Sequence, residues 1–270
     1  MVSFIKVDKF LINMGVVMDL TFKIPSFEYM VNSIYEIELE DMDNFIRGHL
    51  FYFYPNIDKD KFYSFQGNAR KEYLTTCLRD IFVKEQDLFA IKIDTYNKHW
   101  FKNKEIILEA FQDAFRTDLH NEFIDMVGYI GLNPVCPRFL ATNTFDVFYR
   151  NSERGALGIA MHEIVHFVWF KLWGEYFHDD IKEYEIPNLK WVFSEIIPEL
   201  IMRDERLKLR NPYSNGQVIY EYFYKMNIDD KPILDILYEM YSTMTLHEFM
   251  EKGFQLLQKH EEEIRNAMHS

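Results

Sequence analysis

The sequence predicts an α+β fold: one compact unit with a small antiparallel or mixed sheet early in the chain and helices throughout the rest. Three observations predict it. Strand-like segments with glycine and proline breaks occur before residue 150, helix patterns dominate after it, and no Pro/Gly/Ser-rich linker lies between. We therefore expect a mixed subdomain over residues 1–150 and a helical subdomain over residues 151–270 of the same unit.

The first part combines both kinds of element. Loosely alternating apolar residues up to residue 24 indicate one or two strands, and Pro25-Ser26 marks the start of a helix. Two or three helices are expected over residues 69–118, the clearest over 104–116. Alternation over residues 139–149 then predicts a strand, which we place at the edge of the sheet.

The second part begins with the most apolar helix of the chain. Asn151 or Ser152 can cap it, residues 155–173 are almost all apolar, and Gly174 suits the position just past its end. Asn188 can cap the next helix, which is expected to run toward Arg206 with Pro198 inside it.

Charge and composition argue against several classes of partner. The chain has 30 basic and 43 acidic residues, a net charge of -13, and no long Lys/Arg run, so neither nucleic acid nor an anionic membrane surface is an expected partner. Two cysteines are too few for a disulfide framework. No apolar stretch is long enough to span a membrane and no signal cleavage site is visible, so we expect a soluble, cytoplasmic protein. The sequence does not indicate an oligomeric state.

One motif carries chemistry. His162-Glu163-Ile164-Val165-His166 has the pattern His-Glu-x-x-His within the apolar helix. Residues four apart share one helix face, so both imidazoles can bind one metal ion. Glu163 lies about 100° around the helix, beside the metal, where it can accept a proton from a metal-bound water. Two histidines and a glutamate are costly to bury without such a purpose.

A catalytic zinc site needs a third protein ligand and one open position. Trp169 and Leu172 stand where the metzincin continuation requires glycine and histidine. A carboxylate from the following helix remains, and Glu195 is the preferred candidate, with Glu199 one turn further on the same face. The other candidates follow the first helix closely: Glu175, His178, Asp179, Asp180, Glu183 and Glu185.

The two histidines followed by a helix with Ser194-Glu195 resemble the gluzincin, thermolysin-like zinc metallopeptidases, of which this chain would be a small, divergent bacterial member. The resemblance implies a zincin-like fold, one Zn²⁺ per chain, a peptide or protein substrate and Glu163 as general base. It assigns Glu195 as third ligand and Glu199 as the acid that supports the first metal-binding histidine, His162, from outside the ligand set. Ser194 and Glu199 replace the Asn and Asp that are usual in the family, and the spacing to Glu195 is longer than in thermolysin.

The family also implies an edge strand that binds extended peptide, for which residues 139–149 are the candidate, and a residue that stabilises the oxyanion. Tyr213, Tyr220, Tyr222 and Tyr224 are candidates for that residue, with no basis for a choice. Two other functions fit the sequence: a metal-holding binding or regulatory protein on the same scaffold, and a helical interaction protein with an accidental motif. A peptide-cleavage assay and a metal assay separate the three.

Overall fold

The structure is a computed structural model that describes residues 18–40, 45–119, 121–179, 188–213 and 218–268. It is mostly helical with a small mixed sheet, as expected for an α+β fold. Its elements follow in the order β1 (Leu20–Lys23), α1 (Phe27–Glu40), α2 (Phe45–Phe53), α3 (Lys59–Ser64), α4 (Gly67–Lys84), α5 (Gln86–Phe115), β2 (Met126–Gly131), β3 (Arg138–Phe139), the 3₁₀ turn η1 (Leu140–Thr142), β4 (Thr144–Phe148), α6 (Glu153–Phe177), α7 (Leu189–Ile201), α8 (Glu205–Lys208), α9 (Glu221–Lys225), β5 (Asn227–Ile228), β6 (Lys231–Pro232), α10 (Ile233–Thr243), α11 (Leu246–Lys259) and α12 (Glu261–Met268).

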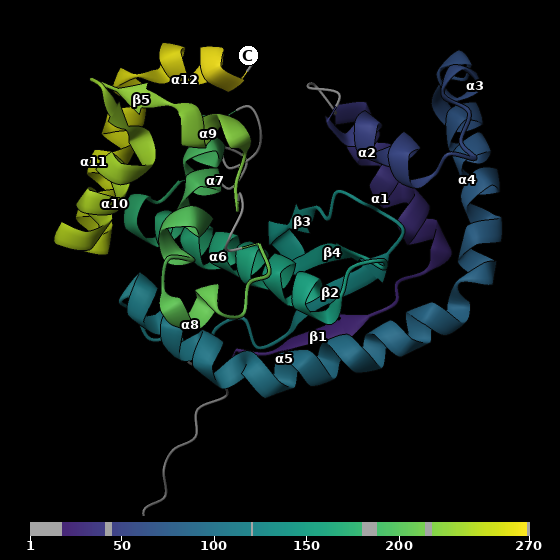
Figure 1. Ribbon diagram of the computed structural model, residues 1–270, viewed down its shortest axis with the longest axis horizontal. Coiled ribbons are helices and arrows are strands. Elements are labelled where there is room, and N and C mark those ends of the chain that lie inside the picture. The colour runs from purple at the N-terminus through teal and green to yellow at the C-terminus, as the bar shows by residue number, and fades with distance from the viewer. Residues whose placement is uncertain (1–17, 41–44, 120, 180–187, 214–217, 269–270) are drawn as a thin grey trace, which may run out of the picture.

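The main sheet has the order β1-β2-β4-β3. β1 pairs with β2 and β2 with β4 in parallel, while the two-residue β3 is antiparallel to β4. Helix α5 runs along one side of this sheet, with α1 to α4 at one end of the molecule and α10 to α12 at the other (Figure 1). β5 and β6 form a separate short hairpin.

The predicted strand over residues 139–149 is wrong in its extent and position. Leu140–Thr142 form a 3₁₀ turn, and Asn143 adopts a left-handed conformation with φ of 52°, which asparagine tolerates better than most residues. The chain reverses there, so the edge position belongs to β3. β4 is an inner strand with all five residues buried, because β2 and β3 flank it and α6 packs against it.

Helix α6 occupies the centre of the molecule (Figure 1). Ser152 caps it by accepting a hydrogen bond from Gly155 N at 3.0 Å, as the sequence predicts. Its predicted end at Gly174 is wrong: the helix continues to Phe177, and His178 ends it in a left-handed conformation with its N–H on Gly174 O. The Trp173 and Phe177 rings, 4.5 Å apart, extend the packing past the glycine. None of the described helices meets the length and hydropathy needed to cross a membrane.

Helix α7 packs against α6. Asn188 caps it as predicted, accepting from Lys190 N at 2.8 Å. The helix tolerates Pro198 near its end but stops at Ile201 and does not reach Arg206, which belongs to the separate helix α8. Trp169 and Trp173 of α6 contact Phe193 of α7, with ring centroids 5.1 and 6.3 Å apart.

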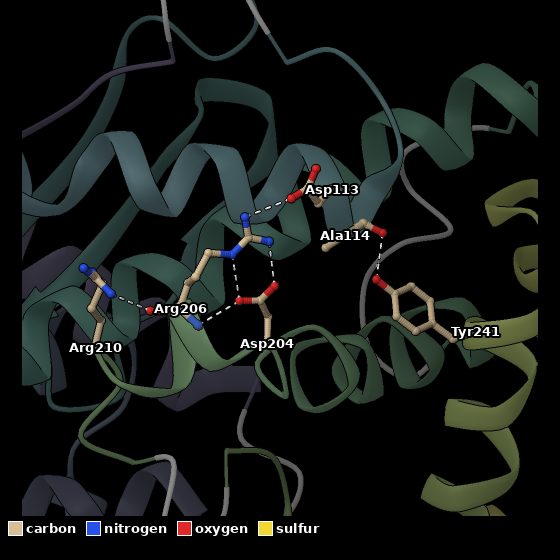
Figure 2. Close-up of polar contacts among 6 residues, drawn as sticks. All are labelled: Asp113, Ala114, Asp204, Arg206, Arg210 and Tyr241. Carbon is tan, nitrogen blue, oxygen red and sulfur yellow. Dashed lines mark hydrogen bonds and ion pairs between the residues drawn. The ribbon is translucent and has the colours of Figure 1, made fainter.

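Polar contacts connect α5 with the later helices (Figure 2). Arg206 is bound to Asp204 at 2.7 Å and to Asp113 of α5 at 2.8 Å. The Tyr241 hydroxyl of α10 donates to the Ala114 carbonyl at 2.7 Å. Because α5 also packs along α6, the first part of the chain holds the position of the helical part.

A buried carboxylate links α1 to the sheet. Asp146 of β4 accepts hydrogen bonds from the Ser33 hydroxyl and, at 3.0 Å, from Tyr29, while the amide of Asn133 donates to Ser33 at 2.9 Å. Burial raises the pKa of Asp146 from 3.8 to about 6, although the two hydrogen bonds oppose that shift.

We expect this carboxyl to make stability depend on pH. Its pKa is higher in the folded than in the unfolded chain, so its contribution is fully present below pH 3.8 and is lost as pH rises through about 6. The shift corresponds to about 3 kcal/mol. Urea unfolding of wild type and Asp146→Asn between pH 4 and 7 should show a smaller loss of stability with pH in the variant. Equal slopes would contradict the assignment.

We expect the packing of α11 on α7 to be intolerant of one added methyl group. A Cβ on Gly253 would lie 2.6 Å from Cζ of Phe193, a ring enclosed by other aromatic rings. Gly253→Ala should therefore lower the free energy of unfolding by about 1–3 kcal/mol. Gly48→Ala is the matched control, because that helical glycine has nothing within 4 Å and alanine favours the helix. Thermal unfolding of both variants measures the difference.

Candidate metal centre

The structure brings the two motif histidines and Glu195 together. His162 and His166 project from α6, and Glu195 projects from α7 toward them. The Nε2 atoms of the histidines are 3.1 Å apart. Glu195 Oε2 lies 4.0 Å from Nε2 of His162, and Oε1 lies 3.7 Å from Nε2 of His166. Among the described residues, this is the group of metal-binding side chains whose ligand atoms all fall within 4.8 Å of one another.

These separations suit a single ion. Ligand atoms on one tetrahedral zinc ion, each about 2.0–2.2 Å from the metal, are about 3.4 Å apart. The nitrogen–nitrogen distance of 3.1 Å and the nitrogen–oxygen distances of 3.7 and 4.0 Å are close to that value. Two nitrogens and a carboxylate oxygen leave the fourth position to a water molecule or a substrate.

The histidines are in the form that binds metal. Burial, with the nearby Arg138 charge, lowers the pKa of His162 to about 3 and lowers the pKa of His166 as well. Both imidazoles are therefore neutral at physiological pH. His166 is fully buried and its ring stacks on Phe170 at 6.1 Å, which restricts the orientation of the ligand.

Glu163 lines the same cavity as His162 and Glu195. It is 7% exposed, and its Oε2 is buried without a hydrogen-bond partner among the described residues. Burial raises the pKa of Glu163 to about 8, while the Arg138 charge opposes the shift and Glu195 adds to it. An unpartnered carboxylate oxygen next to two histidines is suited to exchange a proton with a water molecule in the site.

A cavity of about 720 Å³ reaches this centre. Its walls are largely apolar and aromatic, and its polar groups include Glu163, Glu195 and His162. The residues that line it are His49, Phe53, Pro134, Val135, Cys136, Pro137, Arg138, Phe148, Asn151, Gly158, Ile159, His162, Glu163, Trp191, Glu195, Asn211, Tyr213, Val218, Ile219, Tyr220 and Glu221. An apolar cavity with a few convergent polar groups is typical of a ligand-binding or active site.

Arg138 is the residue of this centre that the sequence does not reveal. Its Nη1 lies 3.0 Å from Oε1 of Glu195, and its guanidinium stacks over the Phe170 ring at 5.5 Å. Both partners come from helices that follow it in the chain, and no motif or spacing connects them with β3. Only the reversal at Asn143 places Arg138 over α6 and α7.

Glu199 does not occupy its predicted place. Its Oε2 accepts a hydrogen bond from Tyr224 at 2.6 Å, and its Oε1 lies 3.6 Å from Nε of Arg203. No described contact joins Glu199 to either metal-facing histidine. The acid was expected to support His162, the first of the two histidines, and the Nδ1 atom of His166 is likewise buried without a partner in the described part of the chain.

The other side chains that the sequence offers as a third metal ligand are not part of this group. Glu175 is bound to Lys171, and Asp179 is bound to Lys190 at 2.6 Å and to Trp173. His178 ends α6, whereas Asp180, Glu183 and Glu185 lie outside the described residues. Four tyrosines were candidates for the oxyanion-stabilising residue, and two of them line the cavity: Tyr213 and Tyr220.

No protein-family model, curated protein or solved structure matches this chain. The functional argument therefore rests on the residues of the site themselves.

We expect Glu195 and Glu199, one turn apart on α7, to differ sharply in metal binding. Glu195→Gln removes a charged ligand and should weaken zinc binding by more than the roughly 10–100-fold that is typical of losing an outer hydrogen-bond partner. Glu199→Gln should leave zinc affinity within about threefold, because Glu199 contacts Tyr224 and Arg203. Competition with a chromogenic chelator measures both. Equal losses in the two variants would reject Glu195 as the third ligand.

Proposed function

We propose that this protein is a zinc-dependent peptidase of the gluzincin type, with a zincin-like arrangement of its site. One observation carries the proposal: His162, His166 and Glu195 converge at ligand spacing next to a cavity that His162, Glu195 and Glu163 line. A helix bearing His-Glu-x-x-His, followed by a helix that supplies a carboxylate, is the arrangement that the sequence resemblance implies.

The set of donors favours zinc. Two neutral imidazoles and one carboxylate are the protein ligands of many catalytic zinc sites, which keep a fourth position open. Zinc bound there would lower the pKa of a bound water toward ~7 and polarise a substrate carbonyl. His162 and His166 would hold the ion from α6, and Glu195 would hold it from α7.

Glu163 is the proposed general base. As the oxygen of a water molecule bonds to the peptide carbonyl carbon, Glu163 takes the proton that the water loses. When the C–N bond breaks, Glu163 returns the proton to the departing amine. The charge of a bound zinc ion would lower the raised pKa of Glu163 and favour its ionised, basic form, and one of its oxygens has no other hydrogen-bond partner among the described residues.

The cavity supports a peptide as the substrate. Its apolar and aromatic walls can bind side chains on either side of the cleaved bond, and its volume of about 720 Å³ is within the usual range of ligand sites. β3 lies at the edge of the sheet and carries a cavity residue, Arg138, so an extended peptide can lie along this edge.

We expect Glu163→Gln to retain zinc and lose most turnover, by about 10²–10⁴-fold, because it keeps the shape of the side chain and removes the base. The zinc-loaded protein is incubated with a mixed peptide library, with and without chelator, and products are identified by mass spectrometry. Glu175→Gln is the matched control, an exposed acid on the same helix that pairs with Lys171.

Three outcomes are informative. Chelator-sensitive cleavage that Glu163→Gln abolishes supports the peptidase. A wild-type protein that binds about one zinc per chain and cleaves nothing in the library supports a binding role for the same centre. A protein that takes up no zinc after reconstitution refutes the metal site altogether.

A further inference from the structure

Arg138 is held beside the metal-binding side chains by two contacts. Its Nη1 is 3.0 Å from Glu195 Oε1, and its guanidinium lies over the Phe170 ring. The Arg138 side chain is 14% exposed and the Glu195 side chain 6%. A charge held in a mostly buried place by an acid and a ring is already oriented, so it needs little rearrangement to act on a ligand.

Arg138 also supplies a charge that the cavity otherwise lacks. Among the described residues that line the cavity, it is the one lysine or arginine, and the acids there are Glu163, Glu195 and Glu221. Hydrolysis of a peptide bond places negative charge on the carbonyl oxygen when water adds to the carbon. Positive donors aimed at that oxygen account for a large part of catalysis in such reactions.

The tyrosines offered by the sequence are less well placed. The Tyr224 hydroxyl donates to Glu199. The Tyr213 hydroxyl lies 3.2 Å from the Cβ position of Gly155, which is about 10 Å along α6 from His162. Tyr220 stacks on Tyr222 with ring centroids 5.5 Å apart and also contacts Trp191. Arg138, in contrast, directly contacts one of the proposed metal ligands.

We propose that Arg138 is the second electrophile of the centre, beside the zinc ion of the proposed function on which this inference rests. Its guanidinium donates a hydrogen bond to the carbonyl oxygen of the cleaved peptide bond. As the water oxygen bonds to the carbonyl carbon, the π electron pair moves onto the carbonyl oxygen, and Arg138 stabilises that charge. When the C–N bond breaks, the pair returns to form the carboxyl product, while Glu163 gives its proton to the amine. The planar guanidinium carries five N–H groups and can contact Glu195 and a second oxygen together.

The test compares Arg138→Gln and Arg138→Lys with wild type at saturating zinc, using a peptide that the library identifies. Arg150→Gln is the matched control: Arg150 is an exposed arginine past the end of β4 whose Nε contacts the Tyr149 hydroxyl at 2.8 Å. We expect Arg138→Gln to lower kcat by about 10²–10³-fold, with KM changed by less than about threefold. Arg138→Lys keeps the positive charge but lacks the paired N–H donors of a guanidinium, so its kcat should lie between those of Arg138→Gln and wild type.

A second measurement does not depend on turnover. Calorimetry on the zinc-loaded proteins compares inorganic phosphate, a tetrahedral anion, with imidazole, a neutral zinc ligand. Arg138→Gln should bind phosphate at least about tenfold more weakly, as expected for loss of a charge-assisted hydrogen bond, and should bind imidazole as wild type does. If Arg138 only oriented Glu195, zinc affinity would fall but kcat at saturating zinc and phosphate binding would not.

The outcomes separate the two proposals. Wild-type kcat in Arg138→Gln at saturating zinc, or equal losses for phosphate and imidazole, would overturn the role of Arg138 and leave the peptidase intact. A wild-type protein without zinc or without chelator-sensitive cleavage would reject the proposed function itself. Circular dichroism checks the fold of each variant. If Arg138→Gln does not fold, Arg138→Met, which keeps the length of the side chain but has no N–H donor and no charge, carries the same comparison: wild-type kcat and phosphate affinity in that variant would overturn the role.

Discussion

Most polar side chains of the candidate metal centre are buried, and their charges must be balanced in that interior. Glu195 and Glu163 are 5% and 7% exposed, and His166 is fully buried. An isolated charge in such a place costs several kcal/mol, so buried charges are usually paired or neutralised. The structure meets this constraint by keeping both histidines neutral and by placing Arg138 against Glu195. Glu163, in contrast, has a raised pKa and an oxygen that no described residue contacts by a hydrogen bond, so this one group is left available to a ligand.

The need to bury α6 explains the architecture around it. A helix that is apolar on almost every side must be covered on every side. α5, α7 and β4 pack against α6, and the C-terminal helices α10 and α11 pack against α7. The position of Glu195 relative to α6 therefore depends on aromatic contacts that include none of the candidate ligands, such as those of Phe193 with Trp169 and Phe249. In this way, α10 and α11 carry none of the candidate ligands but help to fix the distance between those on α6 and α7.

Local signals in the sequence predict much of the centre. The four-residue spacing of His162 and His166 and the caps at Ser152 and Asn188 follow from helix geometry, the family resemblance favours Glu195 over the other acids, and the structure brings Glu195 to the two histidines. What the sequence does not show depends on tertiary contacts. The hydrogen-bond donor to Glu199 is Tyr224, which lies beyond the next helix, and Arg138 reaches the centre only after a chain reversal. The alternation over residues 139–149 suggested one continuous strand because the pattern of side chains carries no information on the backbone of Asn143.

The chain reversal between β3 and β4 limits how the sequence of such a protein can diverge. β3 contains two residues, and successive side chains of a strand point to opposite faces. A single-residue insertion or deletion between Phe139 and Thr144 would shift the pairing by one, turn Arg138 away from the helices and bring Phe139 or Pro137 into its place. The length of this short segment is thus under stricter constraint than the identity of its residues. Related chains should tolerate exchanges of Leu140, Ala141 or Thr142 more readily than any change in their number.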